Sequence, residues 1–437
     1  MVHICNGTNL FYEETIRNRQ KSRFSQWAKM KVLVVSSSFP LNIHTVTASF
    51  VFDEASKSSR RDIVIHVARG VKSIWNKERD LFVENMSIHN FGRKIDPLIV
   101  LSTIKNALAL LPISNFHPEI IATTLPYSWF ITKLIRKHRL DLIHAHFAYP
   151  EGFAGLIAKH ETGRPLIVTL HGVDILTERT IGYGLRLNKG FDIIIRKVLR
   201  EADVVIASST STFEEALNAG CDQRNLVLVP NGVDIKRFTL NIDGRRVRKK
   251  LGIMGKFIVF TLRAHVPKNG IKYLIKAAHT VLRKNPNVYF VIGGDGPLRR
   301  ELEKLADGLG ISGNIVFTGY IPYDELPYYY AASDIFVIPS VIEAFGLVAV
   351  EAMACGKPVV GSNVGGIRDI IRDGQNGYLV EPKDPKSLAD KIAFMLENPS
   401  LREKLGEEGR RTAERNFDIE RRIDKILRIY SRLIEVS

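Results

Sequence analysis

The most constraining feature of this 437-residue sequence is the alternation of short apolar runs with amphipathic helical patterns. The runs are rich in β-branched residues and almost continuous in hydrophobicity, as expected of strands covered on both faces. Such alternation predicts parallel sheets with crossover helices. The predicted strands are Lys31–Ser36, Ile63–Val67, Asp141–His146, Leu166–Leu170, Val204–Ala207, Leu226–Val229, Phe257–Leu262, Val288–Gly293, Ile315–Thr318, Ile335–Ile338, Pro358–Gly361 and Gly377–Val380.

A chain of this length exceeds one hydrophobic core of ordinary size, so we expect two domains. The turn-forming segment Val229–Asp234 separates the two series of strands and marks the boundary. We therefore predict an α/β protein with two doubly wound, Rossmann-like domains, residues 30–230 and 231–415. Residues 416–437 carry apolar side chains at helical spacing and are predicted to form a final helix.

Residues 1–29 differ from the rest of the chain, because they are polar and basic and show no clear period. An apolar strand then begins abruptly at Met30. We hypothesise that the folded domain, and translation, start at Met30. Residues 1–29 would then be an N-terminal extension whose composition allows disorder.

The formal net charge of +16 invites an anionic partner, such as nucleic acid, an acidic membrane surface or a phosphorylated substrate. The densest basic run, Gly244–Lys250, is typical of one exposed helix face. We find no nucleic-acid recognition motif, so nucleic acid is not an expected partner. Three scattered cysteines and no apolar run of membrane-spanning length or signal-peptide core favour a cytoplasmic protein.

The strongest chemical signal follows the predicted strand Ile335–Ile338. Ligands of open parallel sheets bind beyond the carboxyl ends of the strands. Here a helical composition begins at Gly346 and ends at Gly356, and unsatisfied amides at the start of a helix favour an anion such as phosphate. These amides belong to Phe345, Gly346 and Leu347.

Two glutamates bracket this predicted phosphate site. Glu351 lies roughly 7 to 8 Å along the helix axis from Gly346, about the separation of a nucleotide's outer phosphate from its ribose. Glu343 precedes the helix, where it is placed to accept hydrogen bonds from a sugar. Either one alone is compatible with a first-turn carboxylate or a solvated helix residue. The pair together favours a nucleotide sugar.

This pattern resembles the signature of the retaining glycosyltransferases with two Rossmann domains, the GT-B fold, and specifically glycosyltransferase family 4 (glycosyl transferases group 1). The resemblance extends from Met30 to the last helix. It implies an N-terminal acceptor-binding domain facing a C-terminal donor-binding domain across a cleft, with the final helix packing back on the first domain. It also implies that Glu343 contacts the donor sugar and Glu351 the ribose.

Other family landmarks occur in the same order. Arg263 and Lys268 resemble the basic pair on the donor diphosphate, where two cations would offset the charge that grows on the leaving nucleotide. Gly294 and Gly296 resemble the family's glycine loop; a dinucleotide fingerprint would need a glycine in place of Arg299.

Two further turns resemble those of the family. The turn formed by Gly319, Tyr320 and Ile321 resembles the one that contacts the base. The segment Asn363–Ile367 resembles a glycine pair at the start of another helix.

Histidines mark the N-terminal half. His171, in a loop that ends at Asp174, resembles the family's histidine that faces the donor sugar and the acceptor. A neutral imidazole and a carboxylate there are suited to hydrogen-bonding sugar hydroxyls. His144 and His146 share one strand face. Because no third ligand is evident at metal-site spacing, we predict that they support the acceptor cleft and hold no zinc.

Two departures from the family pattern bear on the donor loops. The first loop, which begins at Ser36, lacks the usual glycine pair. Leu262 replaces the glycine before the arginine, and Asn269 separates Lys268 from Gly270. They leave the donor-loop geometry and the donor identity open.

The resemblance implies transfer of a hexosyl unit, with retained configuration, from a UDP- or GDP-sugar to a sugar or lipid-linked acceptor. No Asp-x-Asp pair occurs, so we predict no metal and no cofactor. Acceptor specificity is expected from loops such as Thr45–Phe50 and Ile175–Gly190, and basicity suggests peripheral contact with an anionic membrane, at its inner face. The alternatives are a nucleotide-sugar epimerase on the same fold and a non-enzymatic protein that binds nucleic acid or sugar.

Overall fold

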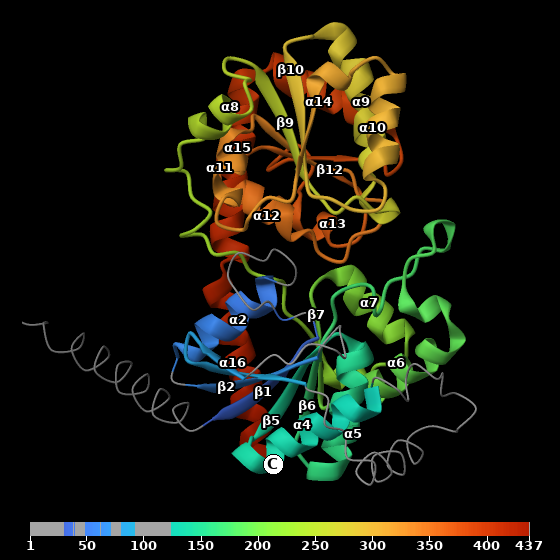
Figure 1. The fold of residues 1–437 in the computed structure, drawn as a ribbon, viewed down its shortest axis with the longest axis vertical. Helices are drawn as coiled ribbons and strands as arrows, with labels where there is room; N and C mark the ends of the chain where they lie inside the picture. The colour runs from blue at the N-terminus through green and yellow to red at the C-terminus, as the bar shows by residue number, and fades with distance from the viewer. Residues whose placement is uncertain are drawn as a thin grey trace, which may run out of the picture.

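The structure is a computed structural model, and it describes residues 30–37, 39, 49–61, 63–70, 80–91 and 124–436. Two α/β domains lie one above the other and give the molecule an elongated shape (Figure 1). The predictions for residues 1–29 and for most of the loop Thr45–Phe50 lie outside the described residues.

The N-terminal domain is built on an eight-stranded sheet in the order β3-β4-β2-β1-β5-β6-β7-β8, parallel throughout except for the β3–β4 pair. Its strands are β1 Lys31–Val35, β2 Val64–Arg69, β3 Leu81–Val83, β4 Met86–Asn90, β5 Leu142–His146, β6 Leu166–Thr169, β7 Val204–Ala207 and β8 Leu226–Leu228. Its helices are α2 Ser49–Ser59, α4 Leu125–His138, α5 Phe153–Thr162, α6 Lys189–Glu201 and α7 Thr210–Asn218.

The C-terminal domain contains a six-stranded parallel sheet in the order β11-β10-β9-β12-β13-β14. Its strands are β9 Phe257–Leu262, β10 Val288–Gly293, β11 Ile315–Gly319, β12 Ile335–Ile338, β13 Val359–Ser362 and β14 Tyr378–Val380. The helices are α8 Arg245–Lys250, α9 Ile271–Lys284, α10 Arg299–Gly308, α11 Leu326–Ala332, α12 Leu347–Ala354, α13 Ile367–Ile370, α14 Pro385–Glu397, α15 Pro399–Asn416 and α16 Ile419–Val436.

The predicted fold class, two parallel-sheet α/β domains, is confirmed, although strands β3 and β4 were not predicted. This antiparallel pair is short, and it turns through Glu84 and Asn85, both at positive φ, without a glycine to signal the turn. In helix α15, two of the four buried positions are glycines, Gly406 and Gly409, so its inner face shows little apolar period. Within the described part of the chain, no helix is both long and apolar enough to cross a bilayer.

Helix α16 completes the core of the N-terminal domain, as the predicted fold class implied. It descends from the upper domain along the lower one (Figure 1). Its buried residues Ile423 and Leu427 belong to the same apolar cluster as Val32 and Ile65 of strands β1 and β2. The last helix of the chain therefore covers one face of the first sheet.

A buried ion pair fixes this helix. Arg422 of α16 bonds the Glu54 carboxylate of α2 at 2.6 Å, and both side chains are almost fully buried. The same guanidinium donates to the carbonyl oxygens of Val229 (2.7 Å) and Pro230 (3.1 Å), where the chain leaves the first domain. One cation thus joins three separate segments.

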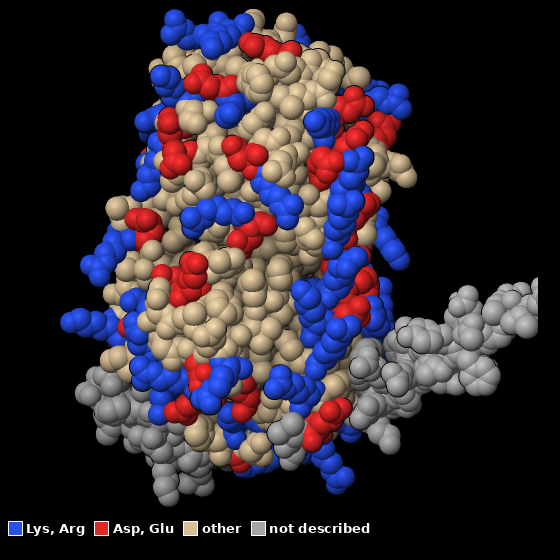
Figure 2. Space-filling model, turned by 180° about the vertical axis from the view of Figure 1, so that it is seen from behind, with Lys and Arg blue, Asp and Glu red and all other residues tan. Residues whose placement is uncertain are grey.

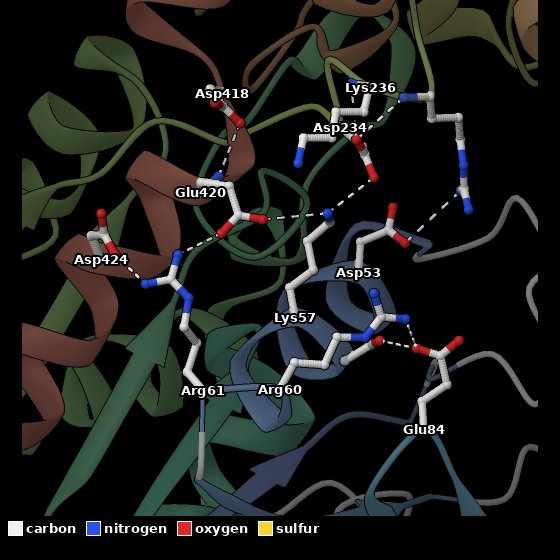
Figure 3. Close-up of polar contacts among 12 residues, drawn as sticks. Asp53, Lys57, Arg60, Arg61, Glu84, Asp234, Lys236, Asp418, Glu420 and Asp424 are labelled. Atoms are coloured by element: carbon white, nitrogen blue, oxygen red, sulfur yellow. Dashed lines mark hydrogen bonds and ion pairs between the residues drawn. The ribbon is translucent and has the colours of Figure 1, made fainter. Parts of the chain in front are cut away.

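A surface network of charges lies beside this pair (Figure 3). Lys57 of α2 bonds Asp234 at 3.0 Å and Glu420 at 3.4 Å. Arg61 bonds Glu420 at 2.6 Å and Asp424 at 2.8 Å. These pairs are partly exposed and individually weak, but they connect α2 to α16 and to the interdomain segment.

Replacing Arg422 with Met should lower the free energy of unfolding by about 3–5 kcal/mol, because it leaves the Glu54 carboxylate buried without its cation. Urea unfolding followed by circular dichroism measures the change. Arg421→Met, at an exposed position of the same helix, is the matched control and should change little. Equal effects of the two substitutions would contradict the role given to the buried pair.

Candidate active site

An ion pair joins the carboxyl ends of two neighbouring strands of the C-terminal sheet. Strands β9 and β12 are adjacent, and Arg263 and Glu343 follow them. The Arg263 guanidinium bonds the Glu343 carboxylate and also donates to Ser340 Oγ at 3.0 Å. Burial alone would raise the pKa of Glu343, but Arg263 and Lys268 lower it to about 2. Glu343 is therefore a carboxylate at neutral pH and can only accept hydrogen bonds.

Asn269, which looked like a departure from the family pattern, holds this arginine. Its side-chain oxygen accepts from the Arg263 guanidinium, and its amide donates to the carbonyl oxygen of Ala264 at 2.7 Å. Asn269 is itself buried. The inserted residue thus fixes the orientation of a predicted donor-binding cation.

Lys268, the second predicted cation, points toward the N-terminal domain. Its Nζ lies 5.2 Å from the centre of the Tyr183 ring, which comes from the loop between β6 and α6. Burial lowers the pKa of Lys268, and the Glu343 carboxylate partly opposes that shift. The two domains therefore meet where the predicted diphosphate-binding cations lie.

Glycines allow the neighbouring loops to approach these cations closely. Gly294 has φ +100°, and a Cβ there would lie 2.2 Å from the carbonyl oxygen of Arg263. Its amide donates to the carbonyl oxygen of Gly319 at 2.8 Å. Gly296 lies beside the backbone of His265. The two predicted glycine turns thus contact each other beside Arg263.

The turn after Gly319 divides its side chains between solvent and core. Tyr320 is 54% exposed, whereas Ile321 is buried in the same cluster as Phe260. The side chain of Ile321 therefore packs in the core. Of the predicted base-contacting turn, only Tyr320 and the backbone of Ile321 are candidates for contact with a base.

Helix α12 begins at the predicted position of the anion site. Gly346 caps α12 with φ +102°, Leu347 is its first residue, and Phe345 is buried against Phe417 (ring centres 5.7 Å apart). The glycine pair of the predicted segment Asn363–Ile367 lies beneath the preceding loop, because a Cβ at Gly365 would lie 1.8 Å from the Glu343 carbonyl oxygen.

Glu351 lies on the inner side of α12. It is 4% exposed, and its carboxyl accepts a hydrogen bond from the Tyr330 hydroxyl at 2.6 Å. Burial raises its pKa to about 7. Glu351 is thus a buried carboxyl whose pKa lies near neutral pH. Its interpretation as a solvated helix residue is wrong.

His171 follows strand β6 of the N-terminal domain, and the next residue, Gly172, lies against Ala344 of the C-terminal domain. The Nε2 of His171 lies 3.0 Å from His146 Nδ1, within hydrogen-bond distance, and the centre of its ring lies 4.8 Å from that of Phe50. Burial and the neighbouring histidines lower its pKa well below the usual value, so the imidazole is neutral at pH 7.

The carboxylate of this loop, Asp174, has a different task from the one expected. It is fully buried and accepts from the backbone amides of Ala148 (2.8 Å), His171 (3.1 Å) and Gly172 (2.9 Å). The expectation that it hydrogen-bonds sugar hydroxyls is therefore wrong. Asp174 shapes the turn that presents His171.

His144 and His146 belong to a network that sequence spacing did not reveal. Glu54 Oε1 lies 3.9 Å from a ring nitrogen of each, so a third metal-ligating group is in fact present. However, both nitrogens of His144 are already bonded, to Tyr430 (2.6 Å) and Thr169 (2.7 Å). This network links α2 and α16 to His171 through His146.

Sequence patterns did not indicate two further buried polar residues, because their partners are distant in the chain. Glu151 is buried and accepts from the Ser37 amide at 2.9 Å, 114 residues away, and burial raises its pKa to about 7. It holds the start of the first loop. Tyr323 donates to Asp53 of α2 at 2.7 Å across the two domains.

Two facing α/β domains, with paired glutamates and cations at the strand ends of the second, define a glycosyltransferase of the GT-B class. Family models agree: Glycosyltransferase Family 4 matches residues 105–237, and Glycosyl transferases group 1 matches residues 243–412. The chain belongs to glycosyltransferase family 4. The matched models describe transferases, which favours this activity over the epimerase and binding-protein alternatives.

Similar proteins support the same assignment. The chain is 34% identical to a D-inositol 3-phosphate glycosyltransferase of Geodermatophilus obscurus over 68% of this chain and 67% of the relative. It is 29% identical to a GDP-mannose-dependent phosphatidylinositol monomannoside mannosyltransferase of Mycolicibacterium smegmatis (65% and 75%). The fold matches Anabaena HepE, solved with UDP and glucose, with TM-score 0.74 and 23% identity over 92% and 99% of the two chains.

The raised pKa of Glu351 predicts a pH-dependent effect of Glu351→Gln. A carboxyl whose pKa rises from about 4.3 in the unfolded chain to about 7 when folded destabilises the folded state progressively across that window. The variant lacks this penalty, so its melting temperature relative to the parent protein should rise between pH 4.5 and pH 7.5. Thermal unfolding at both pH values measures it.

Glu343→Gln is the control with the opposite sign. Because its folded pKa is depressed to about 2, the carboxylate contributes stability above pH 4.3 that the amide cannot supply. This variant should melt below the parent protein at pH 7.5. A pH-independent difference for Glu351→Gln would contradict the titration assigned to it.

Proposed function

We propose that the protein transfers a hexosyl unit from a nucleotide diphosphate sugar to an acceptor hydroxyl with retention of configuration. The observation that carries this proposal is the Arg263–Glu343 pair beside Lys268 at the strand ends of the C-terminal sheet. Arg263 and Lys268 would bind the diphosphate and offset its charge as the glycosidic bond breaks. Glu343, kept ionised, would accept hydrogen bonds from the donor sugar.

The acceptor would approach from the N-terminal domain. The neutral His171 ring can hydrogen-bond a sugar hydroxyl, and Asp174 and His146 hold it in place. In the displacement, the acceptor oxygen bonds to the anomeric carbon on the face that the phosphate leaves, and the departing phosphate oxygen takes the acceptor proton. Glu343 orients the sugar and forms no covalent bond.

We propose a UDP- or GDP-hexose as donor. The Mycolicibacterium relative is GDP-mannose-dependent, and HepE was solved with UDP and glucose. Gly319, Tyr320, Ile321 and Glu351 are the residues proposed for the base and the ribose. Thermal-shift measurements across UDP-, GDP- and ADP-sugars distinguish the donors.

For the acceptor we propose a sugar or a lipid-linked sugar, with peripheral contact to an anionic membrane. The Mycolicibacterium relative acts on a phosphatidylinositol monomannoside. On the face seen in Figure 2, Lys and Arg occur over both domains with Asp and Glu among them. This spread of charge suits weak contact with a membrane. Flotation with anionic vesicles measures membrane contact. Failure of the protein to float with the vesicles at low salt would exclude that contact.

Glu343→Ala should lower kcat for transfer at least about 10²-fold, because both the sugar contact and the partner that orients Arg263 are lost. The assay uses labelled UDP- and GDP-hexoses with sugar or lipid acceptors, and NMR of the product reports the anomeric configuration. Glu301→Ala, at an exposed position of α10, is the matched control. Undiminished transfer by Glu343→Ala, or consumption of donor without an acceptor, would refute the proposal.

Transfer should be unchanged when Mg²⁺ or Mn²⁺ is added or chelated, because Arg263, Lys268 and the amides at the start of α12 take the place of a donor-bound cation. Initial rates at saturating donor, with EDTA and after addition of each ion, measure this. A rate that falls with EDTA and returns with Mg²⁺ would contradict metal-independent transfer.

A further inference from the structure

Three histidines meet on the N-terminal sheet, away from the donor residues. His66 lies on β2 and His89 on β4, and His138 is the last residue of α4. In the parallel pairing of β2 with β4, His66 lies opposite Ser87 and His89 lies opposite Ala68. Since side chains two residues apart on a strand share a face, His66 and His89 both point to the face covered by α4. One ring nitrogen from each of the three lies within 4.8 Å of the other two.

The rings carry hydrogen bonds in a specific pattern. His66 Nδ1 lies 2.9 Å from His89 Nε2, and the two rings are stacked with an interplanar angle of 4°. His89 Nδ1 lies 2.8 Å from the Asp80 carboxylate. That bond places the proton of His89 on Nδ1, so its Nε2 accepts the hydrogen bond from His66 Nδ1, and a bound ion would take the place of that hydrogen bond.

His138 supplies a third nitrogen without a hydrogen-bond partner. Its Nε2 is buried and has no partner among the described residues. Such a nitrogen costs free energy unless something binds it. The ring also lies at the C-terminal end of α4, where the helix dipole favours a cation.

We propose that His66, His89 and His138 bind one divalent transition metal ion, with Zn²⁺ as the best fit and a water as fourth ligand. Three neutral imidazoles are a ligand set that zinc accepts, with Zn–N distances of about 2.0–2.1 Å. Tetrahedral geometry then separates the nitrogens by roughly 3.3 Å, within the spacing found here. Asp80 would orient His89 from behind, as carboxylates do for metal-bound histidines.

Electrostatics around the rings favours the neutral form that binds metals. Burial, together with the neighbouring histidines and Lys31, lowers the pKa of His66 to about 4. Burial also lowers the pKa of His138; His89, Lys137 and Lys31 act in the same direction, and Asp80 opposes them. Asp80 supplies a negative charge beside the cluster, 2.8 Å from His89 Nδ1.

The other cluster of this kind, Glu54 with His144 and His146, is less suitable. Arg422 already neutralises the Glu54 carboxylate at 2.6 Å, and a second cation would be repelled. Both nitrogens of His144 are bonded. The cluster on β2, β4 and α4 differs, because His138 Nε2 has no partner among the described residues. The bond of His89 Nε2 is to His66, another member of the cluster, and a bound ion would replace it.

Such an ion would be structural. It would join β2, β4 and α4 near one edge of the first sheet, whereas the cations and glutamates of the donor site belong to the second domain. Bound metal should therefore raise thermal stability and leave the rate of sugar transfer unchanged.

The test is titration of the full-length, chelator-stripped protein with Co²⁺ and Zn²⁺. We expect one Co²⁺ per chain with the visible ligand-field bands of a tetrahedral complex, displacement by Zn²⁺, and a higher melting temperature. His138→Ala, at a partly exposed helix end, should abolish stoichiometric binding. Asp80→Asn, which removes no ligand, should weaken binding about 10–100-fold.

His160→Ala is the matched control, because His160 also lies in the last turn of a helix, α5, but it pairs with Glu201 and is not a member of the cluster. It should bind Co²⁺ like the parent protein, and circular dichroism checks that each variant is folded. Absence of saturable binding by the parent protein, or equal binding by His138→Ala, would overturn the proposal. These outcomes do not depend on whether sugar transfer is observed.

Discussion

Taking the Glu343 carboxylate out of water is unfavourable, and the donor end of the cleft is organised around the groups that compensate for it. Arg263 and Lys268 keep the carboxylate ionised despite its burial. Asn269 and Ser340 hold the guanidinium in turn. Because these side chains follow adjacent parallel strands, the order of the sheet brings them together. The same charges that stabilise the site are those proposed to meet the donor, so stability and binding share one set of interactions.

Two glutamates eight residues apart show how far environment overrides residue type. Glu343 lies between cations and has a depressed pKa, whereas Glu351 faces the Tyr330 hydroxyl and apolar packing and has a raised one. Spacing along the sequence could place both near a nucleotide. It could not indicate that Glu343 is ionised at pH 7 whereas Glu351 titrates near that pH, because the two pKa values depend on partners contributed by other elements.

The fold class and the positions of the loops at the strand ends could be predicted from sequence because their signals are local. Strand periodicity, the glycines before α12 and the residues that follow β9 and β12 all lie within short windows. The acceptor side could not be predicted in this way. Glu54, Tyr183 and Arg422 meet their partners from segments that are far apart in the chain, and the polar helix α15 buries glycines that carry no apolar signal. Local patterns identify strand ends; only the folded chain identifies which distant side chains arrive there.

The position of α16 has a consequence for biosynthesis. Residues of α16 cover Val32 and Ile65, which are synthesised before the whole of the second domain. The first domain therefore cannot finish its core when its own strands are complete, and it must wait for the second domain to be made. During that interval an apolar sheet face stays open to other nascent chains or chaperones. For the same reason the two domains are one unit of folding, although each has a sheet of its own.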